Sequence, residues 1–220
     1  MNTLKLLPTL LLIIVVLETA LLVVPYLSKS TTSYSAGPVQ SFTFPASVFN
    51  QPISNDTDNE LKPSYNASWE VSIESSLAPV QASRSSEAQI AMAPNFKTEN
   101  LSIPTIIVQE RADGLVRIEY YAQDWNNTFG LVLYNSTSPT WLGDQNITLR
   151  FIAFGPPSQV NPQIAPRPNG NLTIYFGNQV VLLNYPIAWA SMAHIFMYGL
   201  AGSSFTDGSM AVSFRSLSKE

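Results

Sequence analysis

The stretch Leu115-Val-Arg-Ile-Glu-Tyr-Tyr-Ala122 indicates the fold class of this chain. Val116, Ile118 and Tyr120 fall on one side of an extended backbone. Their neighbours at 117, 119 and 121 fall on the other side and include two charged side chains. A period of two is typical of a β-strand with one face in a core and the other in solvent. The preceding Asp113-Gly114 is a turn signal.

The same alternation recurs along the chain, and turn residues interrupt it about every 8 to 12 positions. We expect strands at Trp69–Ser75, Thr105–Glu110, Leu115–Ala122, Phe129–Tyr134, Asn146–Phe154, Leu172–Phe176, Gln179–Leu183, Met192–Tyr198 and Met210–Leu217. Only Ala82–Met92 has a composition that could form a short helix. Many short strands without alternating helices predict an all-β protein, an antiparallel β-sandwich of jelly-roll or concanavalin A-like type, over residues 66–218.

The first 27 residues form the most apolar segment, nearly continuous Leu, Ile and Val from Leu4 to Leu27. About 20 apolar residues suffice for a helix to cross a bilayer, so a signal peptide and a transmembrane anchor are both open interpretations. Lys5 lies at the start of this segment, which favours an N-terminus inside and the remainder outside. Both interpretations predict an extracellular or cell-surface location, with membrane contact through this segment if it is not cleaved.

Residues 28–65 are rich in Ser, Thr, Pro and Asn and have the composition of a polar linker. Within them, Val39–Phe49 is too apolar for a free linker. Phe42 and Phe44 would lie on one face of an extended strand, which predicts that this segment packs against its own domain or against a neighbour's.

The charge of the chain is low: Asp, Glu, Lys and Arg make up 12% of the residues, and the net charge is −4. Scattered basic residues in an acidic chain exclude nucleic acid as an expected partner. The absence of cysteine excludes disulfides and thiolate metal sites. Polar uncharged side chains must therefore supply the surface, which suits a glycosylated protein or an acidic medium.

Seven Asn-x-Ser/Thr sequons support glycosylation, because chance would give about three in a chain of this composition. They begin at Asn55, Asn66, Asn100, Asn126, Asn135, Asn146 and Asn171. We predict N-glycosylation at these asparagines, in agreement with export.

Few side chains suggest catalysis. His194, the single histidine, lies in an apolar run, where a packed role is more common than a catalytic one. Glu70 with Glu74, and Glu119 with Asp124, could supply the carboxylates of a glycoside hydrolase, but solvated strand faces explain them more simply. We therefore expect no catalytic residue, no metal and no cofactor.

Aromatic side chains beside amides and carboxylates are better candidates for function. Sugar rings have flat apolar faces edged by hydroxyls, so an exposed Tyr or Trp can stack on them while Asn or Asp fixes their orientation. The predicted ligand-binding residues are Tyr121, Asp124, Trp125, Asn127, Trp141 and Trp189.

Two C-terminal stretches resemble the closing strands of the concanavalin A-like lectins and glucanases: Ala193-His-Ile-Phe-Met-Tyr-Gly-Leu-Ala-Gly-Ser-Ser204 and Asp207-Gly-Ser-Met-Ala-Val-Ser-Phe-Arg-Ser-Leu217. Ser41-Phe-Thr-Phe44 resembles the opening strand of that family, and Val116–Tyr121 followed by Asn126-Asn127 resembles its legume-type metal-binding strand. The resemblance implies a two-sheet sandwich. Tyr121 stands where the family has a metal-binding Asp, so the calcium–manganese site is not expected.

These observations lead to three functional hypotheses. The first is an exported, N-glycosylated protein that binds a glycan or another cell-surface component without catalysis. The second is a structural subunit of an extracellular filament or surface layer, which would self-associate by adding the Val39–Phe49 strand to a neighbour's sheet. The third is a glycoside hydrolase.

Overall fold

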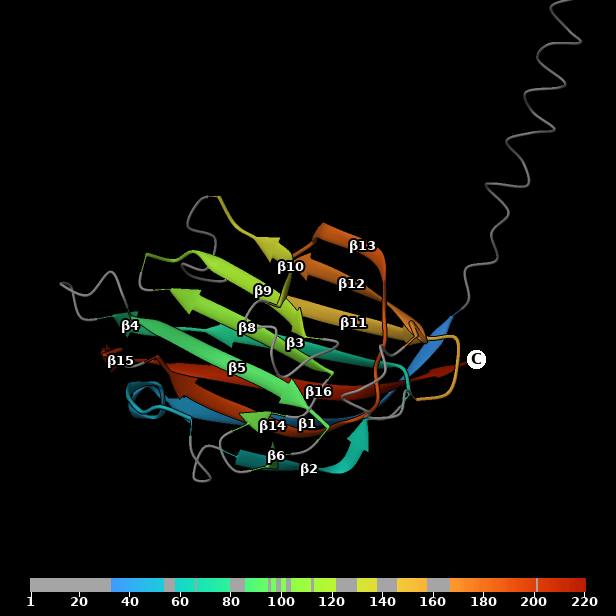
Figure 1. Ribbon diagram of the computed structural model, residues 1–220, viewed down its shortest axis with the longest axis horizontal. Coiled ribbons are helices and arrows are strands. Elements are labelled where there is room, and N and C mark those ends of the chain that lie inside the picture. Colours follow the sequence, from blue (N-terminus) through green and yellow to red (C-terminus); the bar gives the residue numbers. More distant parts are fainter. Residues whose placement is uncertain are drawn as a thin grey trace, which may run out of the picture. The chain divides into compact units, whose positions relative to one another are not determined.

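The computed structural model describes residues 33–53, 58–65, 67–79, 86–94, 96–97, 100–101, 104–111, 113–121, 130–137, 146–157, 167–200 and 202–220. These residues form an all-β protein with two six-stranded antiparallel sheets, as the sequence predicts (Figure 1). The sandwich lies within one compact unit, residues 36–218. A second unit comprises residues 1–35 and 219–220, and in it the Glu220 N–H donates to the Ser33 carbonyl oxygen at 3.2 Å.

Sheet A contains, in spatial order, β1 (Tyr34–Pro45), β16 (Ser209–Lys219), β3 (Trp69–Ser75), β11 (Ile147–Ala153), β12 (Gly170–Phe176) and β13 (Gln179–Ile187). Sheet B contains β10 (Leu131–Asn135), β9 (Val116–Tyr121), β8 (Thr105–Arg111), β5 (Glu87–Ala93), β14 (Met192–Gly199) and β2 (Asp58–Tyr65). Short pairs are formed by β15 (Phe205–Asp207) with β4 (Ala78–Pro79) and by β6 (Phe96–Lys97) with β7 (Asn100–Leu101). A 3₁₀ helix, η1 (Ala46–Asn50), follows β1.

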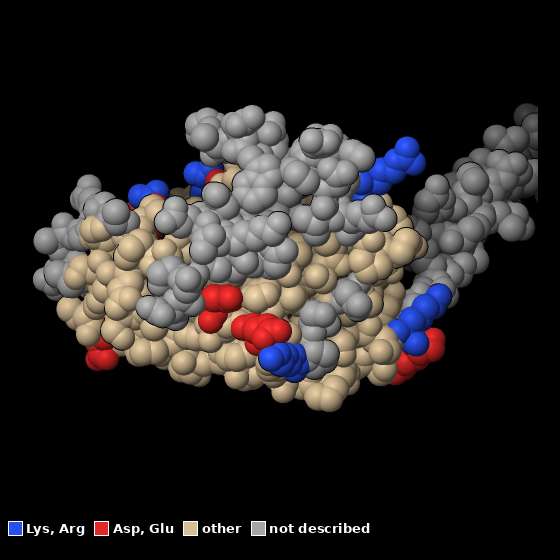
Figure 2. Space-filling model, turned by 60° about the horizontal axis from the view of Figure 1, so that its bottom comes forward, with Lys and Arg blue, Asp and Glu red and all other residues tan. Residues whose placement is uncertain are grey.

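The core lies between the two sheets and is built from the apolar side chains that alternate along each strand. Val116, Ile118 and Tyr120 of β9 are buried in it, which confirms the inward face predicted from the sequence. The alternating apolar side chains of β12 and β16 are buried as well: Leu172, Ile174 and Phe176, and Met210, Val212 and Phe214. The outward side chains are mostly uncharged, and Figure 2 shows only scattered acidic and basic groups over the described surface of one face.

The prediction of a possible short helix over Ala82–Met92 is wrong for the residues of this stretch that the structure describes. Residues 87–93 form β5, a central strand of sheet B between β8 and β14. Alanine favours helix in isolation, but all residues of β5 after Glu87 are buried. A strand covered on both faces shows continuous burial and not alternation, so its sequence resembles that of a buried helix.

The stretch whose composition suggested a linker contributes strands to both sheets. β1 pairs with β16 of the same chain at one edge of sheet A, and β2 is an edge strand of sheet B. The Phe42 and Phe214 rings meet edge to face with centroids 6.1 Å apart. Phe49 of η1 is fully buried. Segment 39–49 therefore packs against its own domain.

The apolar segment 1–27 lies outside the described residues. Within the part of the chain that the structure describes, no helix has both the length and the apolar character needed to span a bilayer.

Candidate binding face of sheet A

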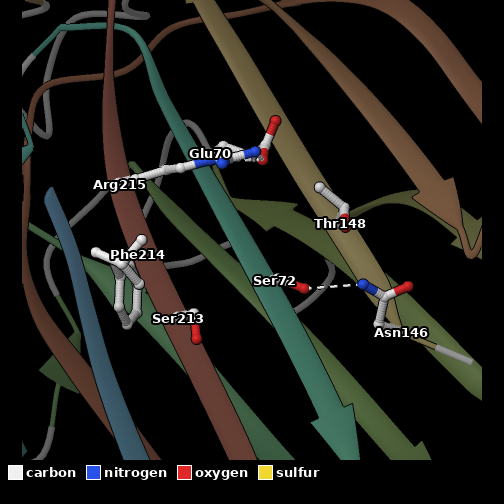
Figure 3. Close-up of a pocket in the computed structure, with 8 residues that line it drawn as sticks. Glu70, Ser72, Asn146, Thr148, Ser213, Phe214 and Arg215 are labelled. Carbon is white, nitrogen blue, oxygen red and sulfur yellow. Dashed lines mark hydrogen bonds and ion pairs between the residues drawn. The ribbon is translucent and has the colours of Figure 1, made fainter. Parts of the chain in front are cut away.

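The outer face of sheet A carries a shallow hollow with a volume of about 300 Å³ (Figure 3). Its lining comes from four adjacent strands: β1, β16, β3 and β11. The lining residues are Val39, Glu70, Ser72, Asn146, Thr148, Ser213, Phe214 and Arg215. Hydroxyl, amide and charged groups thus meet in one depression on an otherwise weakly charged surface.

Strand register aligns hydroxyl groups across this face. Ser72 of β3 lies opposite Ser213 on one side and Thr148 on the other. Thr148 in turn lies opposite Tyr175 of β12, and the Ser41 hydroxyl of β1 is 2.9 Å from that of Ser213. Adjacent strands are about 4.8 Å apart, so these five residue positions repeat at roughly that interval across the sheet. We call this set, Ser41, Ser213, Ser72, Thr148 and Tyr175, the hydroxyl row.

A second row, two residues along each strand, carries charge. Glu70 lies directly opposite Arg215 on β16 and Arg150 on β11. The Arg215 Nε–H donates to Glu70 Oε1 at 2.9 Å, and a second guanidinium nitrogen contacts the same oxygen. The Arg150 Nε lies 3.9 Å from Glu70 Oε2. Two cations share the Glu70 carboxylate, and Glu74 lies on the same face of β3 on the other side of Ser72, so two acids and two arginines flank the hydroxyl row.

Asn146 closes one end of the hollow. Its Nδ2–H donates to Ser72 Oγ at 3.0 Å, as the dashed line in Figure 3 shows. This bond fixes the orientation of the Ser72 hydroxyl and leaves its proton available to a ligand. The same asparagine begins one of the predicted glycosylation sequons, so it has two competing interpretations.

The prediction that Trp189 binds a ligand is wrong, because the side chain is buried. Its exposed fraction is 1%, and its ring centroid lies 5.3 Å from that of Trp69 and 6.4 Å from that of Phe151. The Asn169 side chain accepts a hydrogen bond from the backbone N–H of Trp189 at 2.7 Å and donates one to the backbone carbonyl oxygen of Trp189 at 2.8 Å. The segment after β13 lacks the alternation of a strand, but these bonds hold it in the core. The Trp189 ring therefore packs in the core and presents no surface to a ligand.

Tyr121 is the other predicted ligand-binding residue within the described part of the chain. It lies on the outer face of sheet B, and its hydroxyl donates to Glu119 Oε2 at 2.8 Å. Glu119 also pairs with Arg117 and accepts from the Gln109 amide at 3.4 Å. Burial, followed by the hydrogen bond to Glu119, raises the pKa of Tyr121. Asp124, Trp125, Asn127 and Trp141 lie outside the described residues.

His194 links two strands of sheet B. Its Nδ1 lies 2.8 Å from Asp58 Oδ1 on β2, and its ring stacks on Phe196 with an interplanar angle of 12°. This packed arrangement agrees with the structural role expected from the sequence. Among the described residues, no three His, Asp or Glu side chains gather in a way that could hold a metal ion.

Four sequon asparagines fall within the described residues. Asn135 is exposed in β10, Asn146 and Asn171 are half-buried, and Asn100 belongs to β7. Asn55, Asn66 and Asn126 lie outside the described residues.

Comparison with known proteins gives likeness of fold only. No family model matches the chain, and no curated protein matches its sequence. Sheep galectin-11, solved in complex with glycerol, is 13% identical with a TM-score of 0.37, covering 74% of this chain and 97% of its own. A family 7 alginate lyase, A1-II′ with bound product, is 12% identical with a TM-score of 0.40, covering 83% and 79%. A glycosidic hydrolase is 11% identical with a TM-score of 0.38, covering 85% and 81%. At such identities and TM-scores, nothing about the ligand of this chain follows from them.

Proposed function

We propose that this protein binds carbohydrate, without catalysis, through the hollow on the outer face of sheet A. The observation that carries the proposal is the hydroxyl row, which crosses five neighbouring strands at a regular interval. Saccharides present many hydroxyls that both donate and accept, and Ser and Thr hydroxyls do the same. A rigid sheet holds these partners in fixed positions before the ligand arrives, which lowers the entropy lost on binding.

Side chains beside the hydroxyl row would orient a bound saccharide. Tyr175 supplies an aromatic ring at one end, and such rings stack on the apolar face of a sugar. The Arg215–Glu70–Arg150 row offers charge-assisted hydrogen bonds from two guanidinium groups beside the hydroxyls. Because both of these arginines also contact Glu70, its carboxylate links β16 to β11 across β3.

Binding should weaken when the row loses hydroxyls. We expect Ser72→Ala/Ser213→Ala to raise the Kd for a bound saccharide roughly tenfold, because each hydrogen bond contributes about 0.5–1.5 kcal/mol net. Isothermal titration of the full chain against a panel of neutral and acidic oligosaccharides measures this effect.

The matched control is Ser47→Ala, an exposed serine on η1 away from sheet A's hollow, which should bind as the unaltered protein does. Absence of binding to every saccharide in the panel, or equal Kd values for the double variant and the control, would refute the proposal.

We further propose that the protein acts at the cell surface or in the extracellular medium as an N-glycosylated protein. The apolar segment 1–27 and the excess of sequons support this localisation. The filament hypothesis is less well supported in its original form, because β1 already occupies an edge of its own sheet.

Occupancy of the sequons should follow their exposure. We expect a glycan on Asn135, because its side chain is exposed, and little on Asn146, because its amide donates to Ser72 Oγ. Intact mass and glycopeptide mapping of protein from its native source, before and after deglycosylation, measure both. An unmodified mass would contradict glycosylation. A glycan on Asn146 would fill the hollow and contradict the binding proposal instead.

A further inference from the structure

Three of the ten glycines follow Asp or Asn, and at such pairs a backbone can rearrange without an enzyme. The pairs are Asp113-Gly114, Asn169-Gly170 and Asp207-Gly208. In the rearrangement the glycine nitrogen attacks Cγ of the preceding side chain, and a glycine, which has no Cβ, leaves this approach unobstructed. The attack requires a glycine nitrogen that lies close to that side chain and is not held elsewhere by a hydrogen bond.

The fold opposes the attack at Asp113-Gly114. The Gly114 N–H donates to the Arg111 carbonyl oxygen at 2.8 Å. The Asp113 carboxylate contacts the Arg111 guanidinium at 2.9 Å and accepts from the Leu115 N–H at 3.2 Å. The nitrogen and the carboxylate of this pair are thus engaged by other groups.

Asn169-Gly170 is held at least as firmly. Asn169 is only 7% exposed, and its side-chain nitrogen donates to the carbonyl oxygens of Pro156 and Trp189, each at 2.8 Å. Gly170 begins β12, which lies between β11 and β13 in sheet A. The fold therefore protects this pair from the attack as well.

Asp207-Gly208 has the arrangement that the attack requires. It joins β15 to β16, and the Gly208 N–H donates to Oδ1 of Asp207 at 2.7 Å, which places the nitrogen beside Cγ. Among the described residues, the Gly208 N–H has no other acceptor and the Asp207 carboxylate has no cation partner. Asp207 is exposed, so water reaches the side chain. The φ of Gly208 is +90°, a conformation open to glycine.

We propose that Asp207 is a site of spontaneous isoaspartate formation. The Gly208 nitrogen forms a bond to Cγ of the protonated carboxyl group, and the carboxyl OH leaves with the amide hydrogen as water, which closes a five-membered succinimide. A second water then opens the ring. Addition at the main-chain carbonyl breaks its bond to the Gly208 nitrogen, so that the backbone runs through Cβ and Cγ, whereas addition at Cγ restores aspartate. Water is the only co-reactant.

Isoaspartate would add one carbon to the backbone immediately before β16. The Gly208 carbonyl oxygen accepts from the Ala46 N–H at 3.0 Å, and the Ser209 carbonyl oxygen accepts from the Ser76 N–H at 2.9 Å. A longer backbone displaces these acceptors, so the modification should loosen the start of β16. The site lies outside the hollow on sheet A and does not depend on the proposed function.

Incubation of the folded full chain at about pH 5, warmed but below its melting temperature, tests the site, because a small fraction of an ordinary Asp carboxyl is protonated there. Proteolysis and electron-transfer fragmentation of the peptides then locate isoaspartate. We expect it to form roughly tenfold faster at Asp207 than at Asp113, because the Gly114 N–H must first give up a hydrogen bond that contributes about 0.5–1.5 kcal/mol.

Asp113 is the matched control within the same molecule, because it has the same dipeptide sequence. In urea the rates at the two aspartates should become equal, since the fold and not the local sequence distinguishes them. Asp207→Glu retains the charge but would require a six-membered ring, so it should abolish the product at position 207. Equal rates in the folded protein, a difference that persists in urea, or an unmodified Asp207 after the unfolded chain has converted would overturn the proposal.

Discussion

Trp189→Ala is expected to lower the free energy of unfolding by about 3–5 kcal/mol, the range for removing a buried aromatic side chain from a core. Trp189 packs against the stacked rings of Trp69 and Phe151, and its own ring is almost fully inaccessible. The remaining cavity would be lined by two large rigid rings, which cannot collapse to fill it. The denaturant midpoint, followed by circular dichroism, measures the loss.

Phe154→Ala is the matched aromatic control, because Phe154 is 64% exposed and its removal should change stability by less than about 0.5 kcal/mol. If Trp189→Ala left stability unchanged and abolished saccharide binding, the ring would belong to a ligand site and not to the core.

A second large effect should come from Glu110, which extends from β8 of sheet B toward sheet A. The Ser75 hydroxyl of β3 donates to Glu110 Oε2 at 2.5 Å and accepts from the Leu77 N–H at 3.3 Å. Burial raises the pKa of Glu110 from 4.5 to about 7, and the bond from Ser75 offsets this only in part. The neutral acid is therefore the form that the folded protein favours.

Because the pKa of this acid is higher in the folded state, its contribution to stability is complete below about pH 4.5 and is lost as the pH rises toward 7. One pKa unit corresponds to about 1.4 kcal/mol, so the loss should be roughly 3 kcal/mol. Urea unfolding of the protein and of Glu110→Gln, at several pH values, isolates this contribution as the difference between the two proteins.

Glu74→Gln, an exposed acid on β3, should retain the pH dependence of the unaltered protein. A constant difference between the protein and Glu110→Gln from pH 4 to pH 8 would show that Glu110 does not titrate in this range. A greater stability in mild acid agrees with the low charge of the whole chain, which leaves few carboxylate pairs to be lost by protonation.

Strand positions and the direction of the core could be predicted where a strand has one solvated face. β3 and β9 are examples, because alternation distinguishes their two sides. β5 could not be recognised, since a strand covered on both faces has no such alternation. β1 and β2 are edge strands with many polar residues, so their composition resembles that of a linker.

The candidate binding face depends on information that a single strand does not contain. Serine and threonine at alternate positions could be seen in the sequence of each strand. Their alignment required the order β1-β16-β3-β11-β12, in which every neighbouring pair but β11 and β12 is far apart along the chain, and also the register of each pair. The prediction that Trp189 is exposed and binds a ligand was wrong, because a segment outside the strands can be buried when side chains form hydrogen bonds with its backbone. Here Asn169 supplies those bonds.

The order of strands in sheet A also determines how the protein can fold. β3 is hydrogen-bonded to β16, and the ion pair between them joins residues 145 positions apart in sequence. Such pairings require the closure of a long loop before any stabilising contact is gained, which places folding in the millisecond-to-second range. During synthesis, β3 is made well before β11 and β16, the two strands with which it pairs. Until both strands have been made, Val71 and Ile73, which the folded protein buries completely, lack these core neighbours, so we expect a chaperone to be able to bind the unfinished chain there.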